Sequence, residues 1–384
     1  MVEVKIYNKI SEINKECWDK LAGDNIFLCY GWLKTFEEAT VNPPLPYYIT
    51  LNRGEKITAA SVCYLDKKKE NSRSIDNILF GRSKNIKWLK NVSFLPAVMC
   101  GSKNGYGSHF LFSKDLNENE TIYLYDQLTD IIENIAEKNN ASVYFSNVMS
   151  NEKSLIQILS KRGYYKTFSL PLNYINIQWS SFHDYKKSVS KEHPSMKKTI
   201  PRDINKNRKS GIEVKELQNI EDHWERLYQL LKMNHDKHNT DTFTLKPDYF
   251  LQLKENFGND AILFAGLKGA DIIGVCIELR KDKKAALTRV GIDHNISLDD
   301  LTYFNIAFYE PIRNAIENKI KSIYGGNAFY AMKGRRGYKA ANTFIFYKPY
   351  GRRLNYLIRF WFVIHKLWMK RKFSFAQEIQ KRSS

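Results

Sequence analysis

The order of elements between Asp299 and Ala341 is the sequence feature that most limits how this chain can fold. Apolar residues recur there at three- and four-residue spacing, as they do on one face of an amphipathic helix: Leu301, Phe304, Phe308, Ile312, Ala315 and Ile316. A β-prone run, Ser322–Tyr324, and a glycine pair that can turn sharply or let a ligand approach the backbone come next. The stretch ends with a cationic cluster, Lys333, Arg335 and Arg336, followed by Gly337 and Tyr338. The sequence therefore predicts a helix, a strand, a glycine turn and a cationic loop, in that order.

Length and composition set the broad class of protein. The chain has 384 residues, of which 43% are hydrophobic, so it can bury a large core and is long enough for two domains. Its five cysteines are scattered and show no CxxC spacing, which argues against a disulfide framework or a zinc site and suggests a reducing compartment. We find neither a secretory-type start nor the roughly 18 consecutive apolar residues that a membrane span needs. The expected location is the cytoplasm.

Positive charge is the strongest global signal. Lysine and arginine number 60 against 41 acidic residues, giving a net charge of +19. After Ser180 there are 38 basic and 22 acidic residues, so most of the excess lies in the second half. A field of this kind favours anionic partners, such as nucleic acid, phosphorylated cofactors or a membrane surface, without choosing among them. A solvated basic face is the alternative.

In the first half, helical and extended patterns alternate. We expect two short helices within residues 17–39, a hairpin, a polar loop over residues 66–76, further strands, and then a helix, a strand and a helix. The hairpin pairs residues 47–51 with 57–65, and the further strands are residues 78–80 and 92–99. The closing helix, strand and helix are residues 119–138, 142–146 and 152–162. The glycines between Gly101 and Gly107 fit neither the dinucleotide fingerprint nor the P-loop spacing, which favours a glycine-rich turn.

The second half opens on an extended run at residues 174–179 and a basic run, Lys186–Lys209. Because Pro194 and Pro201 interrupt the basic run, we expect a helix there only after Pro201. Two helical patterns follow, at residues 221–235 and 248–257. After them comes a meander of three β-prone runs separated by tight turns, at residues 261–267, 272–279 and 285–292.

The two halves share an order of elements, namely a meander, a long helix, a short strand and a closing segment. A local echo accompanies it, because Lys161-Arg162-Gly163-Tyr164 resembles Arg335-Arg336-Gly337-Tyr338. We therefore predict an α/β fold with mixed sheets and two related domains, residues 1–180 and 181–350, followed by a basic amphipathic segment, residues 351–384.

Several motifs of the second half resemble those of a known family. They are Arg202–Ile212, the meander, Tyr309–Ile316, Tyr324-Gly325-Gly326, and Lys333 with Gly337-Tyr338. Over about Ser180 to Tyr347 the chain resembles the GNAT superfamily of acyltransferases, and within it the tandem-domain branch that includes Fem-type aminoacyltransferases. The resemblance implies two tandem GNAT-like domains and transfer of an acyl group to an amine.

One departure from the superfamily concerns the donor. No Q/R-x-x-G-x-G/A loop precedes the main helix, where Gly291–Asn295 leads to Leu298-Asp299-Asp300 instead. That loop ordinarily holds the pyrophosphate of coenzyme A at a helix N-terminus, and its absence is also usual for the Fem-like branch. Donor binding is therefore expected at the later cationic turn.

Amide formation needs a neutral amine, donors for the developing oxyanion and a route for the released proton. No nucleophile–base pair is apparent, which favours direct transfer. The expected catalytic residues are Lys333, Arg336 and Tyr338, with donor binding by Gly325, Gly326, Asn327, Arg335 and Arg289. Solvated surface charges and packed aromatics are the alternative for this group.

Four residues are candidates for binding the acceptor amine: His235, His238, Asp293 and Glu310. A structural role is the alternative for each. The two histidines are also candidates for a base or metal ligands, but they have too few companions at ligand spacing to indicate a metal site, which favours a role at the helix end. We therefore expect no metal. The implied function is an N-acyltransferase acting on a cell-envelope or metabolite amine, with acyl-CoA, an acyl carrier protein or aminoacyl-tRNA as anionic donor. The alternative is a non-catalytic basic protein that binds RNA or anionic membrane.

The segment Arg352–Lys372 combines a broad apolar surface with seven basic residues. Tryptophan between basic flanks is typical of an interfacial helix on anionic lipid. Peripheral membrane contact is one interpretation, and docking on the protein body or on a second subunit is the other.

Overall fold

A computed structural model of the chain describes residues 2–67, 75–80, 93–103, 105–107, 109–238, 242–297, 299–351 and 355–382, with side chains in the last range described for residues 358–372. The described residues form two compact units. Unit 1 is drawn from Met1–Glu37, Asn42–Pro171 and Asn342–Phe373, and unit 2 from Glu38–Val41, Leu172–Ala341 and Ser374–Ser384.

Unit 1 is built on a mixed sheet in the order β1-β2-β3-β4-β6-β15-β7, with β5 paired to β3. Its strands are β1 (Glu3–Tyr7), β2 (Leu45–Arg53), β3 (Lys56–Asp66), β4 (Ala97–Cys100), β5 (Phe110–Phe112), β6 (Ser142–Met149), β7 (Tyr165–Phe168) and β15 (Thr343–Lys348). Its helices are α1 (Lys15–Ala22), α2 (Tyr30–Ala39), α3 (Ile75–Phe80), α4 (Glu118–Lys138), α5 (Lys153–Lys161) and the first part of α13 (Asn355–Arg382), with a 3-10 turn at Ile10–Glu12.

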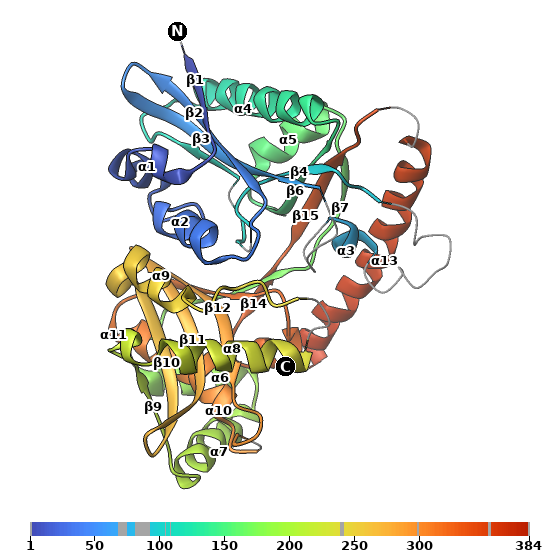
Figure 1. Ribbon diagram of the computed structural model, residues 1–384. Helices are drawn as coiled ribbons and strands as arrows, with labels where there is room; N and C mark the ends of the chain where they lie inside the picture. The colour runs from blue at the N-terminus through green and yellow to red at the C-terminus, as the bar shows by residue number, and fades with distance from the viewer. Residues whose placement is uncertain are drawn as a thin grey trace. The chain divides into compact units, whose positions relative to one another are not determined.

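Helices α4 and α5 cover one face of this sheet (Figure 1). A capping box starts α4, since the Asn117 side chain accepts from the Glu120 N–H at 2.9 Å and the Glu120 carboxylate accepts from the Asn117 N–H at 3.1 Å. Apolar residues at helical spacing, among them Leu124, Leu128 and Ile132, then pack against the strands.

Unit 2 is built on a second mixed sheet in the order β14-β8-β13-β12-β11-β10-β9. Its strands are β8 (Leu172–Asn176), β9 (Ile212–Glu216), β10 (Ala261–Lys268), β11 (Asp271–Lys281), β12 (Lys284–Ile292), β13 (Ser322–Gly326) and β14 (Lys339–Ala341). Its helices are α6 (Phe182–Glu192), α7 (Met196–Lys209), α8 (Trp224–His238), α9 (Tyr249–Phe257), α10 (Thr302–Phe304), the π-helical turn η6 (Asn305–Tyr309), α11 (Glu310–Glu317) and α12 (Tyr330–Gly334), with 3-10 turns at Ile220–Asp222 and Gly258–Asp260.

Each face of the second sheet has its own cover of helices. Helix α8 packs on β11 and β12, where a Cβ added at Gly291 would lie 2.7 Å from the Leu230 backbone. The other face carries α6, α7 and the run from α10 to α11, so that Ile306 and Ile312 lie in one core with Cys276. Figure 1 shows α8 crossing the strands of unit 2.

The two sheets are related by an exchange of strands. Each contains one parallel pair whose strands are joined through a helix, β4 with β6 and β12 with β13. In unit 1 the neighbour of β6 is β15, a strand that follows β14 of unit 2 in the chain. In unit 2 the neighbour of β13 is β8, a strand that follows β7 of unit 1 in the chain. Unit 1 therefore includes Asn42–Pro171 as its second segment and, through β15, Asn342–Phe373 as its third.

The order of elements within each half agrees with the sequence pattern, including the two N-terminal helices, the hairpin, the meander and the long helix. The prediction of a strand at residues 78–80 is wrong, because these residues belong to helix α3, which buries Ile75, Leu79 and Phe80. The Asp76 carboxylate of this helix accepts a hydrogen bond from the Phe94 N–H at 2.7 Å. Much of the loop expected at residues 66–76 lies outside the described residues, as does Leu298.

The basic run Lys186–Lys209 is also more helical than expected. It forms the end of α6 and all of α7, with Pro201 inside α7. Pro201 provides no N–H for the helix, but buried contacts offset that loss. The Asn207 amide donates to the Asp300 carbonyl and the Thr302 hydroxyl, both at 3.1 Å.

Candidate functional site

The candidate site lies where β12 and β13 stop pairing. Their parallel register covers only Lys284–Ala286 against Ser322–Tyr324, after which β12 continues to Ile292 beside β11 alone. Residues 287–290 are half-buried although β12 is a central strand. Beyond Ala286, backbone groups of β12 on the β13 side therefore lack a described strand partner, at the level where β13 ends in Gly325-Gly326.

Lys333 lies beside this point. The lysine is on the short helix α12 rather than in a loop, and only 7% of it is exposed. Its Nζ donates a hydrogen bond to the carbonyl oxygen of Gly325. Burial lowers the pKa of Lys333 to about 8, because an ammonium group loses hydration there. The side chain is therefore a cation at neutral pH that can lose its charge in mildly alkaline solution.

Tyr338 packs directly over the glycine pair. A Cβ added at Gly325 would lie 2.7 Å from Cε1 of the tyrosine ring, so this approach requires glycine. The Tyr338 hydroxyl is buried and has no hydrogen-bond partner among the described residues. Burial raises its pKa well above the usual range, which keeps the phenol protonated.

Arg336 is the centre of a buried polar network. Its Nη2 donates to the Asp203 carboxylate at 3.1 Å and to the Tyr309 hydroxyl at 3.0 Å, and Tyr309 donates to the same carboxylate at 2.7 Å. Its Nη1 donates to the Met332 carbonyl at 3.2 Å, and the guanidinium carbon lies 4.3 Å from the centre of the Phe304 ring. These contacts connect α12 to α7 and η6, and they occupy the guanidinium within the protein.

Glu278 is a buried acid that the sequence analysis missed. Its Oε1 accepts from Arg280 Nε at 2.7 Å, while Oε2 has no partner among the described residues. Burial is the main reason that its pKa is raised to about 7. It also contributes to the raised pKa values of Cys276 and Tyr338, which share the interior of unit 2. The available signal was a single acidic residue within the apolar run of β11.

The other donor-binding candidates differ in their surroundings. The Gly326 carbonyl accepts from the Asn173 amide at 2.8 Å, and the Asn327 carbonyl accepts from the Tyr330 hydroxyl at 2.8 Å. Arg335 is exposed. Arg289 is on β12, with its guanidinium carbon 5.8 Å from the centre of the Tyr249 ring. Gly325, Gly326, Lys333 and Tyr338 are thus brought together, whereas Arg289 contacts α9.

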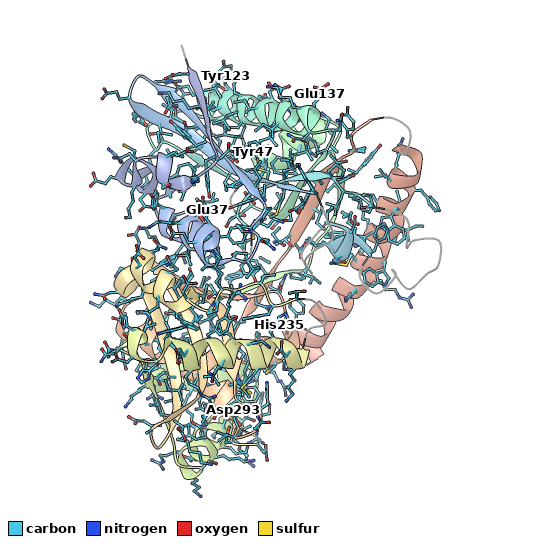
Figure 2. The ribbon with its side chains drawn as sticks, in the orientation of Figure 1. Glu37, Tyr47, Tyr123, Glu137, His235 and Asp293 are labelled. Carbon is cyan, nitrogen blue, oxygen red and sulfur yellow. The ribbon has the colours of Figure 1, made fainter. Side chains whose placement is uncertain are left out.

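Three of the acceptor candidates gather around α8. Asp293, at the end of β12, accepts from Arg226 Nη2 at 2.6 Å and from the Asn295 N–H at 3.0 Å. His235 lies 5.1 Å from the Phe243 ring, and His238 lies 5.6 Å from the His294 ring. Figure 2 shows His235 on α8 and Asp293 lower in the same unit. These residues belong to the α8 side of the sheet, away from α12, which contains Lys333, and from the turn after it, which contains Arg336.

Glu310 is on the opposite side of the sheet, directly after Tyr309. It pairs with Arg313 at 3.3 Å, and burial raises its pKa above the usual value. Within the part of the chain that the structure describes, no group of three or more His, Cys, Asp or Glu side chains could hold a metal ion.

Solved structures show the same fold at low sequence identity. One is FemX, with a TM-score of 0.57 and 10% identity over 93% of this chain and 100% of that one. A second is the C-terminal domain (DUF2156) assigned to a lysylphosphatidylglycerol synthetase from Agrobacterium fabrum, with a TM-score of 0.54 and 10% identity over 88% and 92% of the chains. A third is a tandem GNAT protein from the clavulanic acid biosynthesis pathway, at 0.50 and 9% over 92% and 99%. The expected fold of two tandem GNAT-like domains is confirmed.

Sequence comparison gives the family. No curated protein matches the chain. The model of the FemAB-like family, described as peptidoglycan biosynthesis/recognition, matches residues 9–380, nearly the whole length. The chain is a member of the FemAB-like family.

Proposed function

We propose that this protein transfers an acyl or aminoacyl group from an activated ester or thioester to an amine of a cell-envelope or metabolite acceptor, forming an amide. The observation that carries the proposal is Lys333, a buried cation at the point where β12 and β13 stop pairing. With a pKa of about 8, the Lys333 side chain is charged at neutral pH, and a bound ligand could change its protonation state. Membership of the FemAB-like family supports the link to the cell envelope.

The edge of β12 beyond Ala286, which has no strand partner among the described residues, suits an extended donor. An acyl chain with amide groups, or the aminoacyl end of a tRNA, can hydrogen-bond to free backbone groups as an added strand does. Gly325 and Gly326 lack side chains that would obstruct it. Asn327 follows directly, and the exposed Arg335 lies at the end of α12. Coenzyme A, an acyl carrier protein and tRNA are all anionic, as the charge of +19 favours.

The reaction can then proceed in one displacement. The neutral amine attacks the carbonyl carbon, and the carbonyl oxygen becomes an oxyanion that the Lys333 ammonium and the Tyr338 hydroxyl stabilise. The bond to the leaving oxygen or sulfur breaks as the amide forms, and the amine proton goes to a base. Glu310 is our candidate for that base, because its pKa is raised and it is on the same side of the sheet as Lys333.

Arg336 has a different role in this scheme. Because its guanidinium is already bonded to Asp203, Tyr309 and a backbone carbonyl, we assign it to positioning α12. The group formed by His235, His238 and Asp293 remains a candidate for contacts to the distal part of an acceptor, since it lies on the α8 side of the sheet.

A donor screen tests the proposal. Native mass spectrometry of the full chain with coenzyme A, acyl carrier protein and tRNA identifies which donor binds, and amide product is then sought with the charged form of that donor and a set of amines. We expect Lys333→Ala to slow product formation by at least about 100-fold. Lys268→Ala, which removes an exposed lysine at the β10–β11 turn, serves as the matched control. Salt-sensitive RNA binding that survives Lys333→Ala, without transfer from any donor, would favour a non-catalytic basic protein instead.

A further inference from the structure

Helix α13 has two apolar faces, of which one is docked on unit 1. Phe362 packs on Tyr347, with ring centres 5.7 Å apart, and Trp361 packs on Phe80 at 5.2 Å. One turn further, His365 is buried with its Nδ1 2.8 Å from the Thr167 hydroxyl. The buried residues, Ile358, Phe362, His365 and Met369, follow helical spacing and fix the orientation of the helix.

The opposite side of the same helix carries a second apolar stripe. It consists of Phe360, Val363, Ile364, Leu367 and Trp368, which are between 40% and 66% exposed. Their spacing of i, i+3, i+4, i+7 and i+8 defines one continuous face. Since the other face is already docked, packing on unit 1 does not account for this one.

Positive charge borders the stripe. Arg359, Lys366 and Lys370 are exposed along one flank, and Arg371 lies at its end. The Nζ of Lys372 is 4.9 Å from the centre of the Trp368 ring. No acidic residue occurs between Arg352 and Lys372. Lys166 on the neighbouring strand β7 adds another cation. Its pKa is lowered mainly by burial and, to a smaller extent, by repulsion from Lys366.

We propose that this face of α13 docks the protein on an anionic lipid surface, with the stripe at the level of the acyl chains and the basic residues among the headgroups. The charge pattern favours lipid over a second copy of the chain. If two such stripes packed together, their basic residues would face one another, and the segment has no acidic residue to pair with them. The proposed contact is interfacial, and among the described residues no helix is long and apolar enough to cross a membrane. The proposal does not depend on the transfer reaction.

Flotation with vesicles tests it in the full chain. We expect binding to vesicles of phosphatidylglycerol and phosphatidylcholine in equal parts, and little binding to phosphatidylcholine alone. Leu367→Ser with Trp368→Ser should weaken partitioning by about 100-fold, at roughly tenfold for each lost apolar contact. Lys366→Gln with Lys370→Gln should weaken it by about 30-fold and reduce its salt dependence. Tyr123→Ser removes an equally exposed aromatic from α4 and should leave binding unchanged (Figure 2).

Two results would overturn the proposal. One is that the wild-type chain floats with neither type of vesicle at low salt. The other is that sedimentation shows a wild-type dimer that Leu367→Ser with Trp368→Ser converts to a monomer, which would assign the stripe to a second copy. Circular dichroism and unfolding midpoints of all variants confirm that binding is compared between folded proteins.

Discussion

Lys333 donates its hydrogen bond to the carbonyl of Gly325, eight residues earlier in the chain, at the end of the strand that stops pairing with β12. The contact places a buried ammonium beside the stretch of unit 2 where β12 and β13 separate. The cation at this point is on α12, which follows β13 in the chain.

The pH dependence of transfer follows from the pKa of Lys333. Because the pKa is lowered to about 8, the cation is present below pH 8 and lost above it. Transfer should therefore fall as pH rises through about 8, while an acidic limb reports deprotonation of the amine and base. In Lys333→Arg the guanidinium stays charged, so the alkaline limb should disappear even if the rate is lower. An identical alkaline limb in Lys333→Arg would assign that titration to another group.

Stability of unit 2 depends on the Arg336–Asp203 pair. Both side chains are almost fully buried, so Arg336→Ala leaves the Asp203 carboxylate without its main buried partner. We expect a loss of about 3 to 5 kcal/mol in the free energy of unfolding. The matched control is Arg335→Ala, which removes the neighbouring exposed arginine and should change stability by less than about 0.5 kcal/mol. Urea unfolding measures both, and equal effects would contradict a structural role for Arg336.

Close packing of Tyr338 on Gly325 predicts a coupling between the two positions. A methyl group at Gly325 would lie 2.7 Å from the tyrosine ring, so Gly325→Ala should cost about 1 to 3 kcal/mol. In a Tyr338→Leu background the ring is absent, and the same substitution should cost much less. A double-mutant cycle on unfolding free energies gives the coupling, and additive effects would show that the ring is free to move away.

Glu278 should make unit 2 less stable as pH rises. The pKa of this carboxyl is raised from 4.5 to about 7, so the folded state holds its proton more tightly than the unfolded state does. That contribution is fully present below pH 4.5 and is lost as pH rises through about 7, amounting to roughly 3 kcal/mol. Glu278→Gln should remove this slope in the unfolding midpoint between about pH 5 and pH 8. A slope that persists in Glu278→Gln would have to come from other groups.

Local patterns in the sequence account for much of the fold. Helical periodicity located α4, α8 and α9, and tight turns between β-prone runs located the meander β10–β12. The four-residue echo also has a structural basis. Gly163 and Gly337 both have positive φ, 78° and 84°, two and three residues after α5 and α12 end, and the tyrosine after each is buried. The two four-residue segments also occupy equivalent positions, between α5 and the edge strand β7 in unit 1 and between α12 and the edge strand β14 in unit 2.

What the sequence did not reveal depends on distant contacts. The exchange of β8 and β15 involves pairings between residues far apart in the chain, and no local pattern encodes the choice of sheet. The prolines in Lys186–Lys209 suggested a break, but α7 continues through Pro201, and Asn207 anchors it to the residues before η6. Likewise, the pattern marked Lys333 and Arg336 as one cationic turn, whereas their different partners, Gly325 and Asp203, separate their roles.

The most direct test of the proposed reaction is the initial rate of amide formation by wild-type protein, Lys333→Ala and Lys268→Ala, with the donor that the screen identifies. Removal of an oxyanion-stabilising group typically costs 100-fold or more, so Lys333→Ala should lower kcat by at least about 100-fold while its unfolding midpoint stays close to wild type. Lys268→Ala should stay within about twofold of wild type. A Lys333→Ala protein that forms amide at the wild-type rate would contradict the assignment of this site.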